Sequence, residues 1–213
     1  MSNPLDQLRD NHSDFSKNQE SFLFTDPFVA FESWFNVAVS SGEQEANAMV
    51  ISTVNEFMKP SARVVYLKGL LDQQFVFYTN YLSHKGKDLN QNPNASLLFF
   101  WPGLERQIRI EGTVNKISET ESDAYFASRP RESQLGAWAS HQSEPLVGMD
   151  EITQRYRILD EQFQGDIPRP PHWGGMALRP TYLEFWQGKP SRLHERVCFK
   201  LTEDAWQISR LNP

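Results

Sequence analysis

The sequence predicts a mainly β domain with several inserted helices, an α+β arrangement. From about residue 48 onwards, much of the chain falls into short segments rich in β-branched and aromatic residues, which are typical of strands. Other segments repeat apolar residues at helical spacing. No internal repeat, low-complexity run or clear linker interrupts residues 25–213, so we expect a single domain there. The polar, weakly patterned residues 1–24 are expected to form a mobile N-terminal arm.

The first helix is expected after Thr25-Asp26-Pro27, because a capping residue is followed there by proline. Strands are then expected at 49–54, 63–71, 75–79, 95–101 and 107–117. The run at 95–101 is apolar enough to predict a strand covered on both faces. Helices are expected from about residue 84 and at 119–128, 132–141 and 149–163. A proline- and glycine-rich connection at 167–175 precedes three final strands at 182–187, 192–201 and 206–211.

Composition and charge exclude several classes of protein. A net charge of -6 and a pI near 5.4 argue against general nucleic-acid binding, which needs a broad basic surface. The single cysteine, Cys198, excludes an internal disulfide framework and fits a reducing cytoplasm. The sequence contains neither a signal peptide nor an apolar run of the roughly 18 residues that a spanning helix needs. We therefore expect a soluble cytoplasmic protein without a membrane or nucleic-acid partner.

Several well-known catalytic motifs are absent from the sequence. It has neither the G-x-G-x-x-G of dinucleotide-binding folds nor the G-x-x-x-x-G-K-[ST] of phosphate-binding loops. It also lacks H-E-x-x-H and the G-x-S-x-G nucleophile elbow. The histidines are scattered, so we expect no metal site.

The stretch Arg192-Leu193-His194-Glu195-Arg196 is the most informative local feature. In an extended strand, Arg192, His194 and Arg196 would share one face. This positive face stands out in an acidic chain, and it suits phosphate or flat rings, on which arginine can stack. The ordinary alternative is a solvent-exposed strand face whose charges pair with their neighbours.

A second basic cluster runs from Tyr125 to Ser133. Tyr125 and Arg129 are four residues apart, which places them on one face of a helix. Ser133 follows just after a proline, where its hydroxyl or a helix N-terminal N–H can meet an anion. These groups make a plausible phosphate clamp, and the alternative is an exposed helix end with a serine cap. Lys85, near the start of the next predicted helix upstream, is a milder hint of a bound anion, because the helix dipole alone disfavours a cation there.

Together these segments resemble one family, the pyridoxamine (pyridoxine) 5′-phosphate oxidases. The matching stretches keep their order and cover most of the chain from about residue 47 onwards. The most specific are YFASRPRESQLGAW at 125–138 and RLHER at 192–196. The others are RVVYLK (63–68), FYTN (77–80), ERQIRIEG (105–112), QS (142–143), WGG (173–175) and EFWQG (184–188).

The resemblance implies an FMN-binding split β-barrel and a homodimer with FMN at its interface. It implies that FMN is contacted by Arg63, Val64, Val65, Tyr66, Leu67, Lys68, Tyr78, Thr79, His84, Lys85, Gln107, Gln142, Ser143, Trp186 and Arg196. It also implies that the substrate phosphate is held by Lys68, Tyr125, Arg129 and Ser133. Arg192 and His194 would be the catalytic groups over and beside the pyridine ring, and Arg9 of the arm would also reach the substrate.

The implied activity is oxidation of pyridoxamine 5′-phosphate and pyridoxine 5′-phosphate to pyridoxal 5′-phosphate, with O2 reoxidising the flavin to give H2O2. His194 would hydrogen-bond a ring substituent or assist proton transfer, and the sequence leaves both roles open. A related flavin oxidase of another aromatic compound, as in phenazine biosynthesis, is an alternative. A non-catalytic protein that binds flavin or pyridoxal phosphate is another.

The chain departs from the family pattern at three places. His84 stands where the family often has arginine, which predicts weaker or more pH-dependent FMN binding, because histidine is mostly neutral near pH 7. His12 stands where the family tends to have tyrosine, and residues 16–24 lack the usual basic run.

Overall fold

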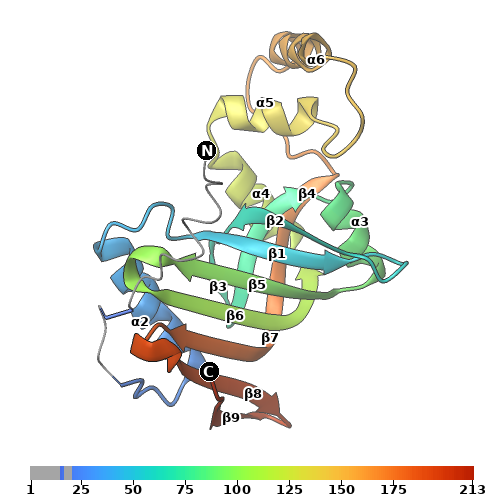
Figure 1. The fold of residues 1–213 in the computed structure, drawn as a ribbon. Coiled ribbons are helices and arrows are strands. Elements are labelled where there is room, and N and C mark those ends of the chain that lie inside the picture. Colours follow the sequence, from blue (N-terminus) through green and yellow to red (C-terminus); the bar gives the residue numbers. More distant parts are fainter. Residues whose placement is uncertain (1–14, 17–20) are drawn as a thin grey trace, which may run out of the picture. The chain divides into compact units, whose positions relative to one another are not determined.

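The computed structural model describes residues 15–16 and 21–213 of the chain. Arg9 and His12 lie outside these described residues. The helices are α2 (Pro27–Ser40), α3 (His84–Gln91), α4 (Glu119–Ala127), α5 (Arg131–Ala139) and α6 (Met149–Gln162), with short 3₁₀ turns η1 (Pro102–Leu104) and η2 (Pro190–Arg192). The strands are β1 (Ala48–Val54), β2 (Pro60–Tyr66), β3 (Gly69–Leu71), β4 (Gln74–Asn80), β5 (Asn94–Trp101), β6 (Arg106–Lys116), β7 (Trp173–Gln187), β8 (Glu195–Thr202) and β9 (Ala205–Arg210) (Figure 1).

Local capping explains where α2, α3 and α4 begin. Asp26 caps α2 by accepting hydrogen bonds from the N–H groups of Phe28 and Val29, and Pro27 fills the first helical position, as predicted. Ser83 caps α3 in the same way, through the N–H of Gly86. A full capping box at Ser118 and Glu121 starts α4.

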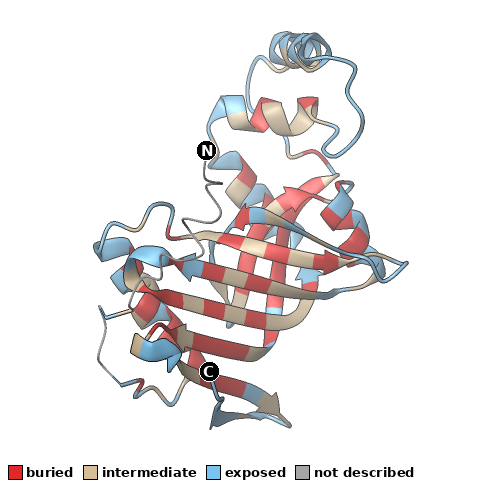
Figure 2. Ribbon diagram, viewed as in Figure 1, coloured by how far each residue is buried: buried red, intermediate tan, exposed pale blue. Residues whose placement is uncertain are grey.

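The strands form a sheet with the order β2-β1-β5-β6-β7-β4-β3, in which β8 pairs with β7 and β9 with β8. More buried and less buried residues alternate along β1, β2 and the first half of β6 (Figure 2). This mainly β sheet with inserted helices confirms the predicted fold class. None of the described helices is long and apolar enough to cross a membrane.

The chain divides into two compact units whose segments alternate along the sequence. Unit 1 comprises residues 1–46, 98–110 and 182–213, and unit 2 comprises residues 47–97 and 111–181. In unit 1, Phe22 is buried against Trp34, Phe185 and Phe199, so the end of the predicted arm contributes to a hydrophobic core. The mobility of the rest of the arm, and a single domain over residues 25–213, stay predictions.

The segment 63–71 was expected to be one strand, and this is wrong. β2 ends at Tyr66 and pairs with β1, whereas β3 starts at Gly69 and pairs with β4. Between them, the N–H of Leu67 donates to Asn47 O and the N–H of Lys68 donates to Val76 O. The chain therefore changes pairing partner at Leu67 and Lys68, which the local β-branched composition does not reveal.

The strand expected at 192–201 starts later, at Glu195. Arg192 lies in the turn η2, where Ser191 and Arg192 have φ values of 56° and 59°. Arg192, His194 and Arg196 therefore do not share a strand face, and that part of the sequence argument is wrong.

Two further expectations need correction. β5 is not covered on both faces, since Phe100 is 59% exposed, and β7 begins at Trp173 inside the expected connection.

Candidate active site

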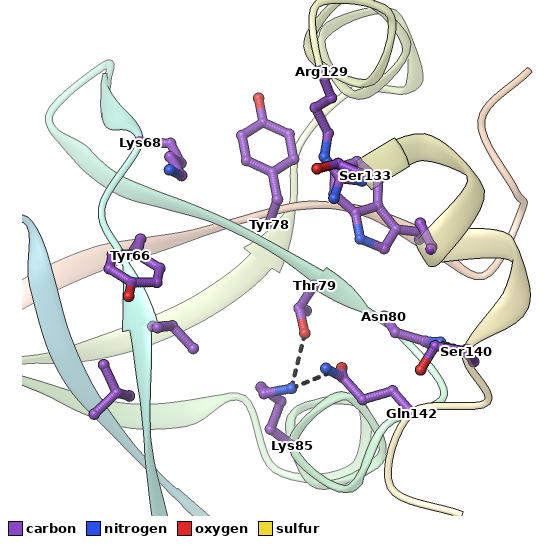
Figure 3. A pocket seen from close by; sticks show the side chains of 15 residues that line it. Tyr66, Lys68, Tyr78, Thr79, Asn80, Lys85, Arg129, Ser133, Ser140 and Gln142 are labelled. Atoms are coloured by element: carbon purple, nitrogen blue, oxygen red, sulfur yellow. Dashed lines mark hydrogen bonds between the residues drawn. The ribbon is translucent and has the colours of Figure 1, made fainter. Parts of the chain in front are cut away.

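A cavity of about 430 Å³ opens in unit 2 (Figure 3). This volume falls within the usual range for small-molecule sites, about 300–1,000 Å³. Strands β2 and β4, helix α5 and the segments that follow them supply most of its wall. Its lining residues are Val64, Val65, Tyr66, Lys68, Tyr78, Thr79, Asn80, Lys85, Arg129, Ser133, Gly136, Ala137, Ser140, Gln142 and Trp173.

Lys85 is a buried cation whose hydrogen-bond partners are all neutral. Its Nζ donates to Thr79 Oγ1 at 3.0 Å, to Ser83 Oγ at 3.1 Å and to Gln142 Oε1 at 3.1 Å. Burial, and to a lesser degree the charge of Arg63, lower the pKa of Lys85 to about 8. A buried ammonium without a carboxylate partner is well suited to an anionic ligand.

Arg129 supplies a second cation to the same cavity. Its guanidinium carbon lies 4.5 Å from the centroid of the Trp173 ring, and its Nη1 is buried without a hydrogen-bond partner among the described residues. Burial lowers the pKa of Arg129, partly offset by Tyr125, but an arginine at this position keeps its charge. Since buried polar groups are normally hydrogen-bonded, this donor is most simply explained by an anion that it would bind.

Ser133 lies in the first turn of α5 and lines the cavity beside Arg129. Its N–H donates to Pro130 O at 2.9 Å. The hydroxyl is therefore the donor of Ser133 that can meet an anion.

Three nearly parallel aromatic rings, those of Tyr78, Tyr125 and Trp173, lie in the same part of unit 2. The rings of Tyr78 and Tyr125 lie 3.7 Å apart and 15° from parallel, and the Trp173 ring lies beside this pair in a nearly parallel plane, 5.5 Å from Tyr78 and 6.3 Å from Tyr125. Tyr125 is not among the lining residues, so its ring supports Tyr78 from behind. Burial is the main cause that raises the pKa of Tyr78, which stays a neutral phenol at physiological pH.

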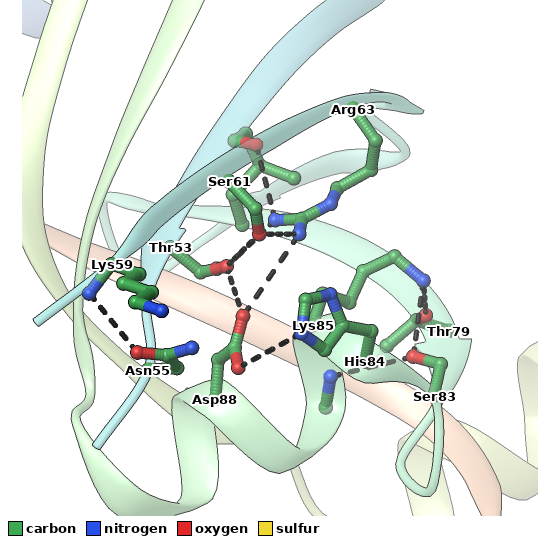
Figure 4. A network of polar contacts seen from close by, with 12 residues as sticks. Thr53, Asn55, Lys59, Ser61, Arg63, Thr79, Ser83, His84, Lys85 and Asp88 are labelled. Carbon is green, nitrogen blue, oxygen red and sulfur yellow. Dashed lines mark hydrogen bonds and ion pairs between the residues drawn. The ribbon is translucent and has the colours of Figure 1, made fainter. Parts of the chain in front are cut away.

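Arg63 and His84 are not among the lining residues and gather instead around Asp88 of α3 (Figure 4). Arg63 Nη1 donates to Thr53 Oγ1 at 2.7 Å, and Thr53 in turn donates to the buried Asp88 carboxylate at 2.7 Å. His84 Nε2 lies 3.8 Å from Asp88 Oδ1, and the His84 side chain is 59% exposed. Their assignment as FMN contacts stays a prediction.

The ring-binding residues predicted at the C-terminal end lie in unit 1. His194 and Trp186 are 4.6 Å apart between ring centroids, and Phe15 contacts both rings edge-on. His194 Nδ1 accepts the N–H of Lys189 at 3.2 Å, which places the proton of the neutral imidazole on Nε2. Burial and then the charge of Arg192 lower the pKa of His194, so it is neutral near pH 7 and can donate from Nε2.

The remaining predicted residues are divided between the units. Gln107 and Arg196 belong to β6 and β8 of unit 1, whereas Leu67 and Ser143 belong to unit 2 without lining the cavity. Sequence reasoning did not select Asn80 and Trp173, which do line it. Both fall within the matched stretches FYTN and WGG, so the signal was present. It was overlooked because a tryptophan or asparagine in a strand carries no chemistry by itself.

An aromatic-walled cavity lined by the cations Lys85 and Arg129, on a mainly β sheet with inserted helices, defines a split-barrel protein of the flavin-binding type. Residues 38–157 match the family described as pyridoxamine 5′-phosphate oxidase. Residues 173–213 match the pyridoxine 5′-phosphate oxidase C-terminal dimerisation region. The chain belongs to the pyridoxamine 5′-phosphate oxidase family, which confirms the resemblance seen in the sequence.

Curated relatives agree with this assignment over nearly the full length. The pyridoxine/pyridoxamine 5′-phosphate oxidase of Microcystis aeruginosa is 55% identical over 91% of this chain and 92% of its own. That of Leptospira biflexa is 50% identical over 99% of this chain and 100% of its own. Among solved structures, PhzG from Burkholderia lata in complex with tetrahydrophenazine-1-carboxylic acid has a TM-score of 0.85 at 27% identity, and covers 92% of this chain and 100% of its own. A pyridoxamine 5′-phosphate oxidase-related, FMN-binding protein from Nostoc punctiforme shares the fold, with a TM-score of 0.71 at 16% identity over 90% of this chain and 100% of its own.

Proposed function

We propose that this chain oxidises pyridoxamine 5′-phosphate and pyridoxine 5′-phosphate to pyridoxal 5′-phosphate with FMN as cofactor. The amine would react with O2 and water to give the aldehyde, ammonia and H2O2. The alcohol would react with O2 to give the aldehyde and H2O2. The observation that carries the proposal is the pair of cations on one cavity, the buried Lys85 and the half-buried Arg129 with its buried Nη1, since two phosphorylated ring compounds need two phosphate sites.

FMN fits the end of the cavity around Lys85. The buried ammonium with only neutral partners suits the cofactor phosphate, and Thr79 and Gln142 hold it in place. The β2 residues Val64, Val65 and Tyr66 offer an extended edge along the same cavity. When bound, FMN would supply the redox chemistry, taking a hydride from the substrate carbon and passing the electrons to O2.

The substrate phosphate would bind at the end that contains Arg129. Arg129 would offer its unpaired Nη1, Ser133 its hydroxyl and Lys68 a further charge. Tyr125, whose ring stacks on Tyr78, would complete the clamp with its phenol. Binding the phosphate far from the reacting carbon uses remote binding energy to orient the ring. Arg192 would cover the pyridine ring, and neutral His194 would donate a hydrogen bond from Nε2 to a ring substituent.

We further propose that two copies of the chain form a homodimer with FMN at its interface. The match of residues 173–213 to a dimerisation region supports the assembly. The predicted FMN contacts Trp186 and Arg196 fall within that region, as do Arg192 and His194, which are predicted to lie over and beside the pyridine ring. A cytoplasmic location remains part of the proposal, and the single cysteine, buried and free, is compatible with it.

The test is to incubate the purified protein with FMN and each vitamin B6 phosphate in air. Steady formation of pyridoxal 5′-phosphate with an equal amount of H2O2 is expected. If the protein binds FMN but makes no aldehyde from either compound, the substrate assignment is wrong. Turnover of a phenazine precursor would then indicate an oxidase of the PhzG type. Binding of flavin or pyridoxal phosphate without any turnover would indicate a carrier.

A further inference from the structure

The face of β7 and β8 that carries Trp186 and Arg196 also carries a buried carboxylate, Glu184. Trp186 and Arg196 are direct cross-strand partners, and Glu184 lies two residues before Trp186 on the same face, opposite Cys198. Glu184 is 2% exposed. A buried carboxylate in the middle of a strand needs partners of its own, because burial of an unpaired charge is costly.

Both carboxylate oxygens of Glu184 accept hydrogen bonds. Oε1 accepts the Nε–H of Arg196 at 2.8 Å, while Oε2 accepts the hydroxyl of Tyr182 at 3.0 Å and Nη1–H of Arg109 at 3.1 Å. Burial alone would raise the pKa of Glu184, but the hydrogen bonds from Arg196 and Tyr182 and the charges of Arg196 and Arg109 outweigh it and lower the pKa. Glu184 is therefore an anion that two arginines share.

Arg196 is held at two of its three nitrogens. Nε donates to Glu184, and Nη1 donates to the carbonyl oxygen of Asn212 at 3.0 Å. These two contacts fix the plane of the guanidinium. Within residues 21–213, no hydrogen bond of the protein uses Nη2, so this nitrogen can serve a ligand.

We propose that Glu184 is a positioning residue that orients Arg196 toward FMN. The inference rests on the proposed function, in which Arg196 is an FMN contact. Glu184 itself is too deeply buried to be a ligand group, so its effect on FMN would act through Arg196. Arg109 shares the carboxylate but is not a predicted FMN contact, and it provides the matched control.

The test compares Glu184→Gln with Arg109→Met by titrating the apoproteins with FMN and following flavin fluorescence. Glu184→Gln leaves the shape of the side chain but removes the charge that holds Arg196, and we expect FMN affinity to fall about tenfold, as for loss of a hydrogen bond to a charged group. Arg109→Met removes the other ion pair of Glu184 and should leave the affinity within about twofold of the wild type. An equal loss in both variants, or no loss in Glu184→Gln, would overturn the proposal.

Two further variants separate an effect on FMN binding from an effect on folding. If Glu184→Gln folds poorly, the double variant Glu184→Gln/Arg109→Met removes one negative and one positive charge together, and it should fold while still binding FMN about tenfold more weakly. In an Arg196→Gln background, Glu184→Gln should cost little further affinity, whereas a full additive loss contradicts action through Arg196. If the wild-type protein binds no FMN, the proposed function as a whole is wrong. If the wild type binds FMN and Glu184→Gln binds it equally well, only the role of Glu184 is wrong.

Discussion

The guanidinium of Arg129 lies over the indole ring of Trp173, 4.5 Å from its centroid, and its buried Nη1 has no hydrogen-bond partner in the part of the chain that the structure describes. Stacking on the ring fixes the position of the guanidinium in the cavity, and the unpaired Nη1–H sets the direction in which it can donate a hydrogen bond. The arrangement is costly without a ligand and favourable with an anion. It therefore suits the substrate phosphate that is proposed to bind here.

Arg129→Ala should mainly raise KM for both vitamin B6 phosphates. Loss of a desolvated charge partner costs about 2–5 kcal/mol, so kcat/KM should fall by at least about 30-fold. Steady-state kinetics with FMN in excess measure this, and Arg157→Ala, an exposed arginine on α6, is the control. A wild-type KM in Arg129→Ala would remove the residue from the phosphate clamp.

Arg192→Ala should lower kcat as well as raise KM. Arg192 is predicted to cover the pyridine ring, so its loss would affect the geometry of the reacting carbon and not only binding. The exposed Lys200→Ala on β8 is a suitable control. If kcat stayed at the wild-type value while KM rose, Arg192 would be a simple binding residue.

Features that depend on neighbouring residues could be predicted from the sequence, whereas contacts between residues far apart in the chain could not. The start of α2 at Asp26-Pro27 was predictable because capping involves neighbours in the chain. Lys85 and Arg129 stood out in the sequence because their unusual positions are visible locally, and both line the cavity, whereas their anion-binding roles stay predictions. The η2 turn was not, since the left-handed backbone of Arg192 interrupts a segment whose composition suits a strand. The pairing of Arg63 with Thr53 and Asp88, and the stacking of Tyr78 on Tyr125, join residues far apart in sequence, and no spacing rule reveals them.

His84→Arg tests the departure of this chain from its family. His84 lies 3.8 Å from Asp88 and next to Lys85, so an arginine at this position places a permanent positive charge near the expected phosphate site. His84→Arg should therefore bind FMN more tightly than the wild type. Fluorescence titrations of the two apoproteins in the same buffer measure both affinities. Equal affinities for the two proteins would contradict the role of His84.

Because the pKa of Lys85 is lowered, we expect opposite pH trends for the stability of the apoprotein and for FMN binding. Its pKa of about 8 in the folded protein lies below the ordinary value of 10.5, so between these limits the unfolded chain binds more protons. The stability of the apoprotein should therefore gain a contribution as the pH rises through 8, which is complete above 10.5. FMN affinity should fall over the same range, because the neutral amine no longer attracts the phosphate. Lys85→Arg, which stays charged, should lose both trends. Denaturant unfolding and FMN titration from pH 7 to 10 measure them, and parallel rather than opposite trends would show that Lys85 does not bind the cofactor phosphate.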